Sequence, residues 1–329
     1  MDSIRWAIVG TGFISTRFAQ GMRAVRDAEL AAVVSRTAEA ARAFSDRFGG
    51  SCYTDIAAML QEARPDIVYL GIPNDRHFPY LMQILEAGVP VLSEKPIVDN
   101  RRQLDQVIAA AQKKDLFLME GMWTRCFPAV QKARHWIEEG RIGRPLSLFC
   151  SFDIQPDYAD WQPWKAGISH AGGALRDVGI YTLGMAWLTF GGGPESHTVY
   201  MTKNDEVDIS AKMLLSYGGG RTAFLSASFN QISRPETEIV GEAGRILIGP
   251  EFWDPTTAVL LGTDGSSETF TMPFEETGFQ YEIMEVQRCL RAGEKESPLF
   301  PLRETMEIAD LIEQIRKEQG ILYAADSDA

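Results

Sequence analysis

The first 120 residues of the chain alternate between short apolar segments and amphipathic segments, and this alternation constrains the fold more than any other feature. The apolar segments span residues 6–9, 30–34, 67–70, 89–92 and 116–119. Apolar strands that are joined by helices are typical of a parallel sheet with helices on both faces. The sequence therefore predicts an α/β Rossmann domain, a doubly wound parallel sheet, over residues 1–121.

The first apolar segment ends in a glycine-containing turn, which a helix-like stretch over residues 16–26 follows. The first glycine permits a tight turn, the second lets a diphosphate approach the backbone, and the helix N-terminus offers free N–H groups. Ser15 occupies the third position of this fingerprint, which needs only a small residue. These features predict a dinucleotide site, and its expected contact residues are Gly10, Thr11, Gly12, Phe13 and Ile14.

The end of the second apolar segment predicts which cofactor this site prefers. Ser35, Arg36 and Thr37 follow the glycines by about 20 residues, where an NAD-preferring site usually has Asp or Glu. An arginine flanked by hydroxyl groups can pair with a 2′-phosphate and stack on adenine. The alternative is an exposed arginine that opens the next helix. We expect NADP, with NAD use also possible.

Polar residues also follow the third apolar segment, at the sheet edge where open α/β sheets bind their ligands. Pro73, Asn74 and His77 lie there. We expect these residues to contact the nicotinamide half of the cofactor or the substrate. For His77, capping of a helix over residues 78–87 is an equally consistent interpretation.

The residues Glu94-Lys95-Pro96 follow the fourth apolar segment and present a cation at the same edge. Pro96 disfavours the helical region for Lys95 and removes a backbone donor, so the lysine lies on a rigid turn. Taken alone, these residues also fit a surface lysine in a turn. After the last strand, Trp123 and Arg125 are expected near the nucleotide crevice, although a tryptophan packed between domains fits equally well.

Residues 122–329 contain strands with closely spaced glycine turns, which predict antiparallel hairpins. Strands are expected at 146–154, 209–217, 221–229, 236–240, 245–248, 258–261 and 268–272, and helices at 127–139, 172–190, 279–292 and 302–319. This pattern predicts an α+β domain with a large, mostly antiparallel open sheet and helices on one face. A second copy of the chain is the simplest cover for the other face, which predicts a homodimer or homotetramer.

Two features of this second domain are candidate parts of a substrate site. The segment 155–171, with Tyr158, Trp161 and Trp164, lacks periodicity, which fits a specificity loop or a packed surface loop equally well. Asp177 and Tyr181 are four residues apart and therefore share one helix face. A carboxylate and a phenol near a lysine can transfer protons, because a cation favours the phenolate. The alternative is an aspartate near a helix start with an unrelated tyrosine.

Composition excludes several classes of partner. The net charge of −13 argues against nucleic acid and anionic membranes, because it supplies no excess of cations for phosphate. The four cysteines form no C-x-x-C pair and fit reduced thiols in a cytoplasmic protein. No apolar signal region and no apolar run of membrane-spanning length is found. We expect a small-molecule substrate, no metal and a cytoplasmic location.

Taken together, the motifs resemble those of the Gfo/Idh/MocA family of nucleotide-dependent oxidoreductases. The resemblance covers nearly the whole chain and rests on Gly10-Thr11-Gly12, Ile72-Pro73-Asn74 with His77, Glu94-Lys95-Pro96, Gly140-x-Ile142-Gly143, and Gly172-Gly173-Ala174-Leu175 with Asp177-x-Gly179-x-Tyr181. Within the family, Trp123-Thr124-Arg125 and the tyrosine at 181 look most like the dimeric dihydrodiol dehydrogenases and the NADP-linked D-xylose dehydrogenases. Ser15 departs from the usual glycine or alanine, and the segment 155–171 has no family pattern.

The resemblance implies a cis peptide bond before Pro96, bound NADP with Glu94 in its site, and Lys95, Asp177 and Tyr181 at the reacting carbon. Trp123 and Arg125 would complete the substrate pocket together with these three residues. The implied reaction is hydride transfer between the nicotinamide and a secondary alcohol carbon of a sugar or cyclic diol. Two alternatives stay open: an oxidoreductase that recycles tightly bound NADP between two sugars, and a non-catalytic NADP-sensing regulator.

Overall fold

The computed structural model of the protein describes residues 3–155 and 163–327. The chain divides into two compact units. The first unit contains Met1–Gly121 and Phe274–Leu302, and the second contains Met122–Pro273 and Arg303–Ala329. We describe each unit by itself.

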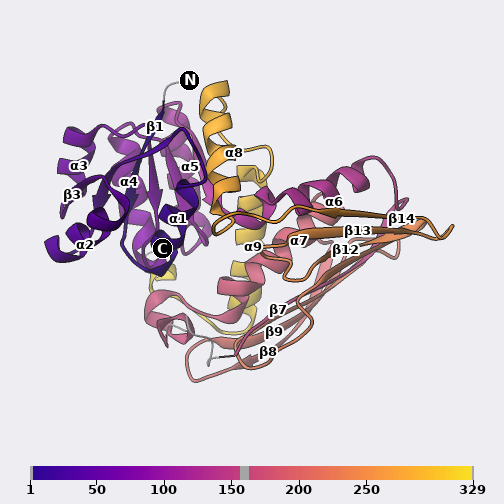
Figure 1. Ribbon diagram of the computed structural model, residues 1–329. Helices are drawn as coiled ribbons and strands as arrows, with labels where there is room; N and C mark the ends of the chain where they lie inside the picture. The colour runs from indigo at the N-terminus through magenta and orange to yellow at the C-terminus, as the bar shows by residue number, and fades with distance from the viewer. Residues whose placement is uncertain (1–2, 156–162, 328–329) are drawn as a thin grey trace. The chain divides into compact units, whose positions relative to one another are not determined.

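The first unit is built on a six-stranded parallel sheet with the order β3-β2-β1-β4-β5-β6. Its strands are β1 (Ile4–Val9), β2 (Ala28–Val34), β3 (Ser51–Tyr53), β4 (Ile67–Leu70), β5 (Val91–Glu94) and β6 (Leu118–Gly121). The order reverses direction between β1 and β4, and open sheets bind their ligands at such a switch point. The predicted doubly wound sheet is confirmed (Figure 1). The short edge strand β3 was not predicted.

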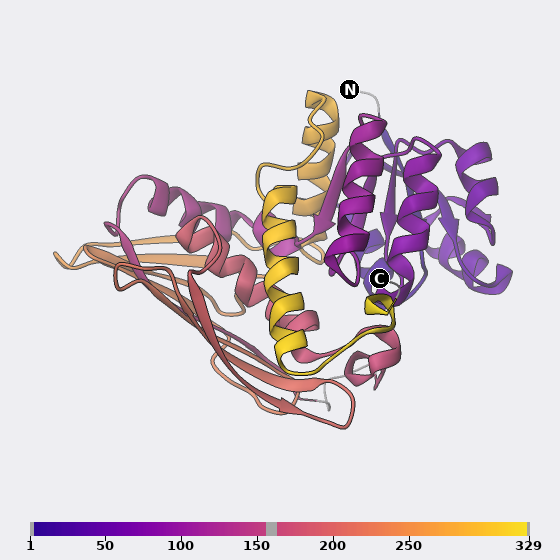
Figure 2. The same ribbon diagram turned by 180° about the vertical axis from the view of Figure 1, so that it is seen from behind.

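The strands of this unit are joined by the helices α1 (Phe13–Met22), α2 (Ala38–Phe48), α3 (Ile56–Ala63), α4 (His77–Glu86) and α5 (Arg101–Lys113). Three of these helices begin at a residue whose side chain caps them. Thr37, Asp55 and Asn100 accept backbone N–H groups at the starts of α2, α3 and α5. Figure 2 shows α4 and α5 side by side on one face of the sheet, where they pack against each other.

The first unit contains one segment, Phe274–Leu302, that lies beyond the predicted domain boundary at residue 121. Helix α8 (Phe279–Ala292), expected within the domain 122–329, lies in the first unit and packs on α1. The reason is steric fit: a Cβ on Gly21 would lie 2.8 Å from the Cβ of Phe279, and the rings of Phe18 and Phe279 are 5.8 Å apart. Sequence order alone does not reveal that a segment so late in the chain completes the first unit.

The second unit contains an eight-stranded sheet with the order β14-β13-β12-β11-β7-β10-β9-β8. Its strands are β7 (Pro145–Asp153), β8 (Ser196–Lys203), β9 (Asp208–Ser216), β10 (Thr222–Ser228), β11 (Thr237–Gly241), β12 (Gly244–Gly249), β13 (Thr257–Gly262) and β14 (Ser267–Thr271). Only the central β7–β10 pair is parallel, so the predicted, mostly antiparallel sheet is confirmed.

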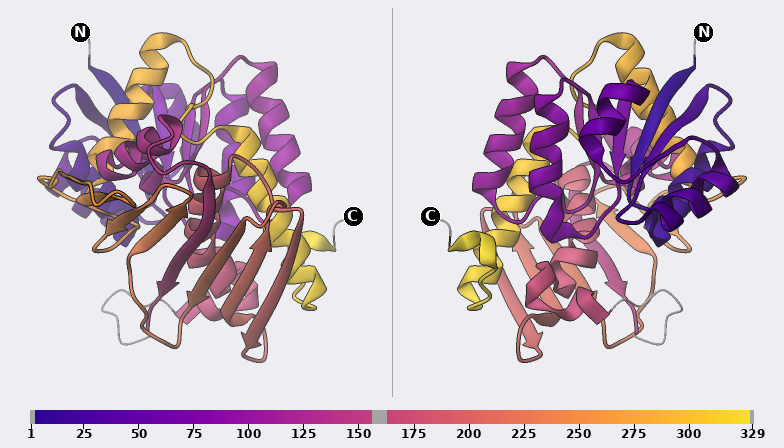
Figure 3. Two further views of the ribbon diagram at one scale, coloured as in Figure 1. Left: turned by 90° about the vertical axis from the view of Figure 1, so that its right-hand side faces the viewer. Right: turned by 90° about the vertical axis from the view of Figure 1, so that its left-hand side faces the viewer.

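Helices pack on one face of this second sheet. α6 (Pro128–Glu138) contacts β12, β13 and β14, and α7 (Ile180–Phe190) contacts β7 and β10. α9 (Leu302–Glu318) is joined to α7 by a hydrogen bond from the indole N–H of Trp187 to Glu307 at 2.7 Å. Figure 3 (left) views the broad opposite face, on which no described helix of this unit lies. Phe149, Leu214 and Phe224 are each more than 40% exposed there, and the rings of Phe149 and Phe224 stack at 4.9 Å.

Candidate active site

The turn after β1 has the backbone geometry that a dinucleotide site requires. Gly10 has a φ of +105°, and a Cβ at this position would lie 2.2 Å from the carbonyl oxygen of Gly71, so only glycine fits. A Cβ on Gly12 would meet no atom within 4 Å, which leaves space in front of α1. Among the residues that the structure describes, no side chain caps α1, and its first turn contains no acidic residue, so its N–H groups suit an anion. These residues fit a dinucleotide diphosphate.

Two side-chain hydroxyl groups hold this turn to neighbouring strands. The Oγ of Ser15 is buried and donates to the carbonyl oxygen of Gly71 at 3.1 Å. Serine at the third fingerprint position therefore provides a bond across the switch point that glycine or alanine would lack. The Oγ1 of Thr11 and the Oγ of Ser35 are 2.9 Å apart, which ties the turn to the end of β2.

Arg36 and Thr37 differ in how the fold uses them. Arg36 is exposed, and its side chain makes no hydrogen bond or ion pair with the residues that the structure describes. Its guanidinium is thus available to a phosphate. Thr37 instead accepts the N–H of Ala40 at 3.2 Å as the cap of α2, so part of its predicted role belongs to the helix.

Three buried groups fix the turn that carries Lys95. The peptide bond between Lys95 and Pro96 is cis, as the resemblance implies. A carboxylate oxygen of Glu120, at the end of β6, accepts the N–H of Ile97 at 2.9 Å. The Oε2 of Glu94 accepts the N–H of Lys95 itself at 3.3 Å. The backbone on both sides of the half-buried lysine is therefore anchored to the carboxyl edge of the sheet.

His77 is the third anchor. Its fully buried ring places Nδ1 at 3.0 Å from the carbonyl oxygen of Pro96 and Nε2 at 2.9 Å from that of Ile72. Since a carbonyl oxygen only accepts, both bonds form together only in the doubly protonated ring. This placement supports a role in positioning Lys95 rather than the direct ligand contact that we expected. Asn74 is also buried, and it begins the single 3₁₀ turn Asn74–Arg76 that follows Pro73 and leads into α4.

Glu94 also interacts electrostatically with a second buried carboxylate, that of Glu282. The Oε1 of Glu94 accepts the hydroxyl of Tyr69 at 2.6 Å, and the Tyr69 ring stacks on Phe18 at 3.6 Å. Glu282 of α8 is fully buried, and neither of its carboxylate oxygens has a hydrogen-bond partner among the described residues. Burial, and then the charge of Glu94, raise the pKa of Glu282 well above its ordinary value. Burial and the neighbouring carboxylate of Glu94 therefore both favour the protonated form of Glu282.

Asp177 lies in the second unit, within a single π-helical turn, Leu175–Gly179, rather than in the predicted α-helix. Such turns in α-helices are frequently found at functional sites. Asp177 is buried, and its carboxylate lies 3.1 Å from the Nζ of Lys165. Lys165 belongs to the predicted loop 155–171. Tyr158 and Trp161, which were predicted to belong to the same loop, lie outside the described residues, as does the side chain of Trp164.

Tyr181 lies in the first turn of α7, and its side chain is 8% exposed. The ring of Phe152 is 5.4 Å from it and stacks at 4.0 Å on Trp253. Phe252 packs edge-on against both Phe152 and Trp253. Phe152 of β7 and the residues Phe252 and Trp253, which follow β12, therefore form an aromatic cluster next to the Tyr181 ring.

Trp123 and Arg125 lie in the 3₁₀ turn Trp123–Cys126 of the second unit. The guanidinium of Arg125 is buried, donates to the carbonyl oxygen of Gly184 at 2.8 Å and pairs with Glu304 at 3.0 Å. Burial lowers the pKa of Arg125, although Glu304 opposes this effect. These contacts support a structural role for Arg125 instead of the predicted ligand contact. Trp123 is buried and packs edge-on against Phe127 at 5.2 Å.

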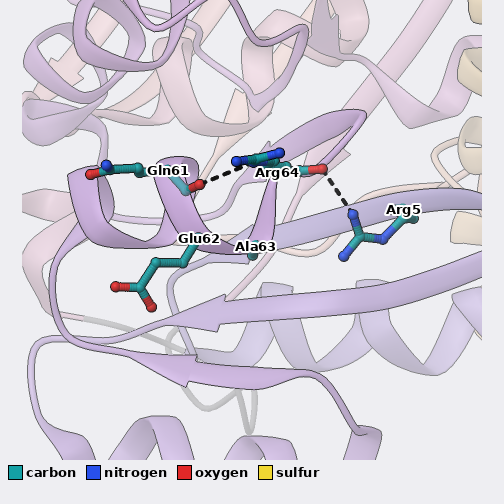
Figure 4. Close-up of a pocket in the computed structure, with 5 residues that line it drawn as sticks. All are labelled: Arg5, Gln61, Glu62, Ala63 and Arg64. Atoms are coloured by element: carbon teal, nitrogen blue, oxygen red, sulfur yellow. Dashed lines mark hydrogen bonds between the residues drawn. The ribbon is translucent and has the colours of Figure 1, made fainter.

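One open pocket of the first unit involves neither its glycine turn nor its Lys95 turn. It is lined by Arg5, Gln61, Glu62, Ala63 and Arg64 (Figure 4). Arg5 is near the start of β1 and donates to the carbonyl oxygen of Arg64 at 3.0 Å. In a parallel sheet this is the edge opposite the carboxyl ends, so the pocket is not the dinucleotide site. Among the described residues, no helix is long and apolar enough to cross a membrane, and no cluster of metal-ligating side chains occurs.

Sequence reasoning missed three residues that contact the predicted site residues or hold the turn that carries Lys95. Glu120 directly follows an apolar strand, as Lys95 nearly does, and this position was the available signal. Tyr69 reads as an ordinary strand residue, and only the adjacency of β4 and β5 brings it to Glu94. Lys165 lies in a segment without periodicity, so nothing in the sequence indicated its contact with Asp177.

The chain is similar to known oxidoreductases over its whole length. Residues 4–122 match the model of an oxidoreductase family with an NAD-binding Rossmann fold, and residues 130–247 match the GFO/IDH/MocA C-terminal domain. The trans-1,2-dihydrobenzene-1,2-diol dehydrogenases of Sus scrofa and Homo sapiens are each 30% identical to it, with 98% of this chain and 99% of theirs covered.

Solved structures agree with this assignment. A 3-ketoreductase from Actinomadura kijaniata, crystallised with NADP, is 26% identical, with a TM-score of 0.80 over 96% of this chain and 97% of the other. The aldose-aldose oxidoreductase of Caulobacter crescentus, 22% identical, shares the fold, with a TM-score of 0.86 over 97% of this chain and 98% of its own. The chain belongs to the Gfo/Idh/MocA family of oxidoreductases.

Proposed function

We propose that the protein is an NADP-dependent dehydrogenase that acts on a secondary alcohol of a sugar or a cyclic diol. The observation that carries this proposal is the turn of Lys95, whose flanking backbone is held by Glu94, Glu120 and the carbonyl contact of His77. A turn fixed in this way keeps a cation in one place at the ligand-binding edge of a Rossmann sheet, as a reacting oxygen requires.

The residues of this chain would divide the reaction between them. The bound nicotinamide would take up or supply the hydride at its C4. Lys95 would hold the substrate oxygen and favour the phenolate of Tyr181, which would exchange the hydroxyl proton. Asp177 would orient Lys95 or a neighbouring substrate hydroxyl, and its carboxylate is paired with the Nζ of Lys165 at 3.1 Å. Phe152 and Trp253 offer an apolar surface for the C–H face of a ring.

The preference for NADP rests on Arg36. Its guanidinium is exposed, and the hydroxyl groups of Thr11 and Ser35 lie at the adjacent turn. The NADP complex of the related 3-ketoreductase is consistent with this preference. We expect Arg36→Ala to weaken NADP binding by about tenfold to a hundredfold, as for one charge-assisted fork, and to weaken NAD binding far less, because NAD loses only the stacking on adenine. Equal losses for both cofactors would contradict this assignment.

The experiment that tests the function is an absorbance assay at the reduced nicotinamide band. Purified protein is mixed with NADP, and then with NAD, against aldoses, inositols and trans-dihydrodiols. We expect reduction of NADP with one of these classes, and the names of the relatives favour the dihydrodiols. No reduction across the panel, despite demonstrated NADP binding, would contradict the proposal and favour a regulator. NADP that copurifies and does not exchange would favour the self-recycling oxidoreductase.

We also propose that copies of the chain associate through the open face of the eight-stranded sheet. Phe149, Leu214 and Phe224 form an exposed apolar row across β7, β9 and β10. Monomers rarely expose such clusters without a partner. Phe224→Lys should shift the mass measured by light scattering toward the monomer, and an unchanged mass would contradict this interface.

A further inference from the structure

The turn that precedes Asp177 is held from three directions within the second unit. Gly172 and Gly173 form this turn, and the N–H of Asp177 donates to the carbonyl oxygen of Gly173 at 2.9 Å. The N–H of Gly173 donates to the carbonyl oxygen of Lys165 at 2.8 Å. A Cβ on Gly172 would lie 2.3 Å from that same oxygen, so the turn and the loop are in close contact. The position of Asp177 therefore depends directly on the position of Gly173.

Asp208, the first residue of β9, closes the second side of the turn. Its carboxylate is 1% exposed, and its Oδ2 accepts the N–H of Leu175 at 2.6 Å. The N–H of Ala174 is also bonded to it. A Cβ on Gly173 would lie 2.3 Å from Oδ1, so the carboxylate lies directly against the turn. Asp208 thus supplies acceptors to the first N–H groups of the π-helical turn that contains Asp177.

Tyr323 closes the third side from the C-terminal segment. Its hydroxyl donates to the carbonyl oxygen of Gly172 at 2.6 Å. Its ring is contacted by two guanidinium groups, those of Arg176 at 5.1 Å and Arg316 at 4.4 Å. Arg316 is buried and pairs with Asp326 at 2.6 Å, and the N–H of Tyr323 donates to the same carboxylate at 2.8 Å. The C-terminal segment is therefore fixed onto the turn.

The charge of Asp208 is retained at a cost in stability. No salt bridge to it occurs among the described residues, although Lys203 is its partner in the β8–β9 register and Arg176 and Arg316 contact the nearby Tyr323 ring. Burial raises the pKa of Asp208 to about 6, although the N–H groups of Leu175 and Ala174 oppose this effect. Burial of an ionised carboxylate without a paired cation costs stability. We therefore expect that Asp208 is kept because its oxygens accept the N–H groups of the turn before Asp177.

We propose that Asp208 and Tyr323 are positioning residues that hold the Gly172-Gly173 turn and so fix Asp177 for hydride transfer. This inference rests on the proposed role of Asp177 at the substrate. The residues themselves touch neither substrate nor cofactor in the proposed reaction. Asp208 acts from the start of β9 and Tyr323 from the C-terminal segment. The C-terminal segment therefore contributes to catalysis by positioning Asp177.

The test uses Asp208→Asn and Tyr323→Phe in the full-length protein. We expect each variant to lower kcat by tenfold or more, with KM and the NADP dissociation constant changed less than twofold. Hydrogen exchange at the Leu175 and Asp177 amides should become faster in both variants. The matched control is Asp264→Asn, an exposed aspartate that also accepts a backbone N–H, from Ser266 at 2.9 Å, and it should leave all these quantities unchanged.

Normal kcat and normal amide exchange in both variants would overturn the inference. Should Asp208→Asn fail to fold, Tyr323→Phe decides alone, because it removes one hydroxyl and keeps the ring that contacts both arginines. Asp177→Asn separates this inference from the proposed function. If that variant keeps full activity, the proposed function of Asp177 is wrong, and the exchange data still report whether Asp208 and Tyr323 hold the turn. If it abolishes activity while Asp208→Asn and Tyr323→Phe do not lower kcat, only the positioning inference is overturned.

Discussion

Two turns of this protein carry candidate catalytic side chains, and they are stabilised in different ways. The Lys95 turn is held by groups at the ends of neighbouring strands, since Glu94 ends β5 and Glu120 lies in β6 beside it. The Asp177 turn is held by Asp208 at the start of a later strand and by Tyr323 near the end of the chain. Both turns use a buried carboxylate as an acceptor of backbone N–H groups. The first arrangement follows from sheet topology, whereas the second depends on long-range packing.

The largest expected effect comes from the first turn. Lys95→Met should lower kcat by about a thousandfold or more, because it removes the cation that would hold the reacting oxygen. Steady-state assays with NADP measure this effect. The matched control is Lys113→Met, an exposed lysine at the end of α5. If Tyr181→Phe retains near-normal turnover while Lys95→Met abolishes it, the proton role belongs to the lysine and not to Tyr181.

The second prediction concerns stability and tests the carboxylate of the Asp177 turn. The pKa of Asp208 is about 6 in the folded protein against an ordinary value of 3.8, so the folded state binds more protons between these two pH values. This group therefore contributes stability below pH 3.8 that is lost as the pH rises to about 6, by at most about 3 kcal/mol.

Denaturant unfolding of the wild type and Asp208→Asn at pH 4 and pH 7 measures this contribution. The free energy of unfolding of the variant should gain relative to the wild type as the pH rises. A constant difference between the two proteins at both pH values would show that Asp208 has the same pKa in the folded and unfolded states, against our account.

The third and smallest effect is expected at the anchor of the Lys95 turn. Glu120→Ala leaves the buried N–H of Ile97 without its acceptor, which should cost about 1–3 kcal/mol of unfolding free energy. It should also lower kcat by about tenfold through displacement of the lysine. Glu120→Gln keeps an acceptor oxygen and should restore most of both losses. No rescue by glutamine would mean that the negative charge of Glu120 matters more than its bond to Ile97.

The difference between the two turns also explains what could be predicted from the sequence. The parallel sheet, the glycine turn and the lysine turn follow from local patterns, because the carboxyl ends of parallel strands meet at one edge. The contact of Lys165 with Asp177 and the anchors Asp208 and Tyr323 have no local signature. Arg125 shows the opposite error. Its place directly after the last strand of the Rossmann domain predicted a ligand contact, yet its guanidinium is bonded to Gly184 and Glu304. Helix α8 joins the first unit because it packs on α1, which no local pattern encodes.

The measurement that tests the central claim most directly is single-turnover hydride transfer, followed at the reduced nicotinamide band with saturating NADP and a trans-dihydrodiol or D-xylose deuterated at the reacting carbon. The account predicts that Glu120→Ala and Asp208→Asn both slow this step and raise its deuterium isotope effect, while the NADP dissociation constant stays within twofold of the wild type. An unchanged transfer rate in both variants, with only cofactor or substrate binding weakened, would contradict the claim that the two turns position the reacting groups.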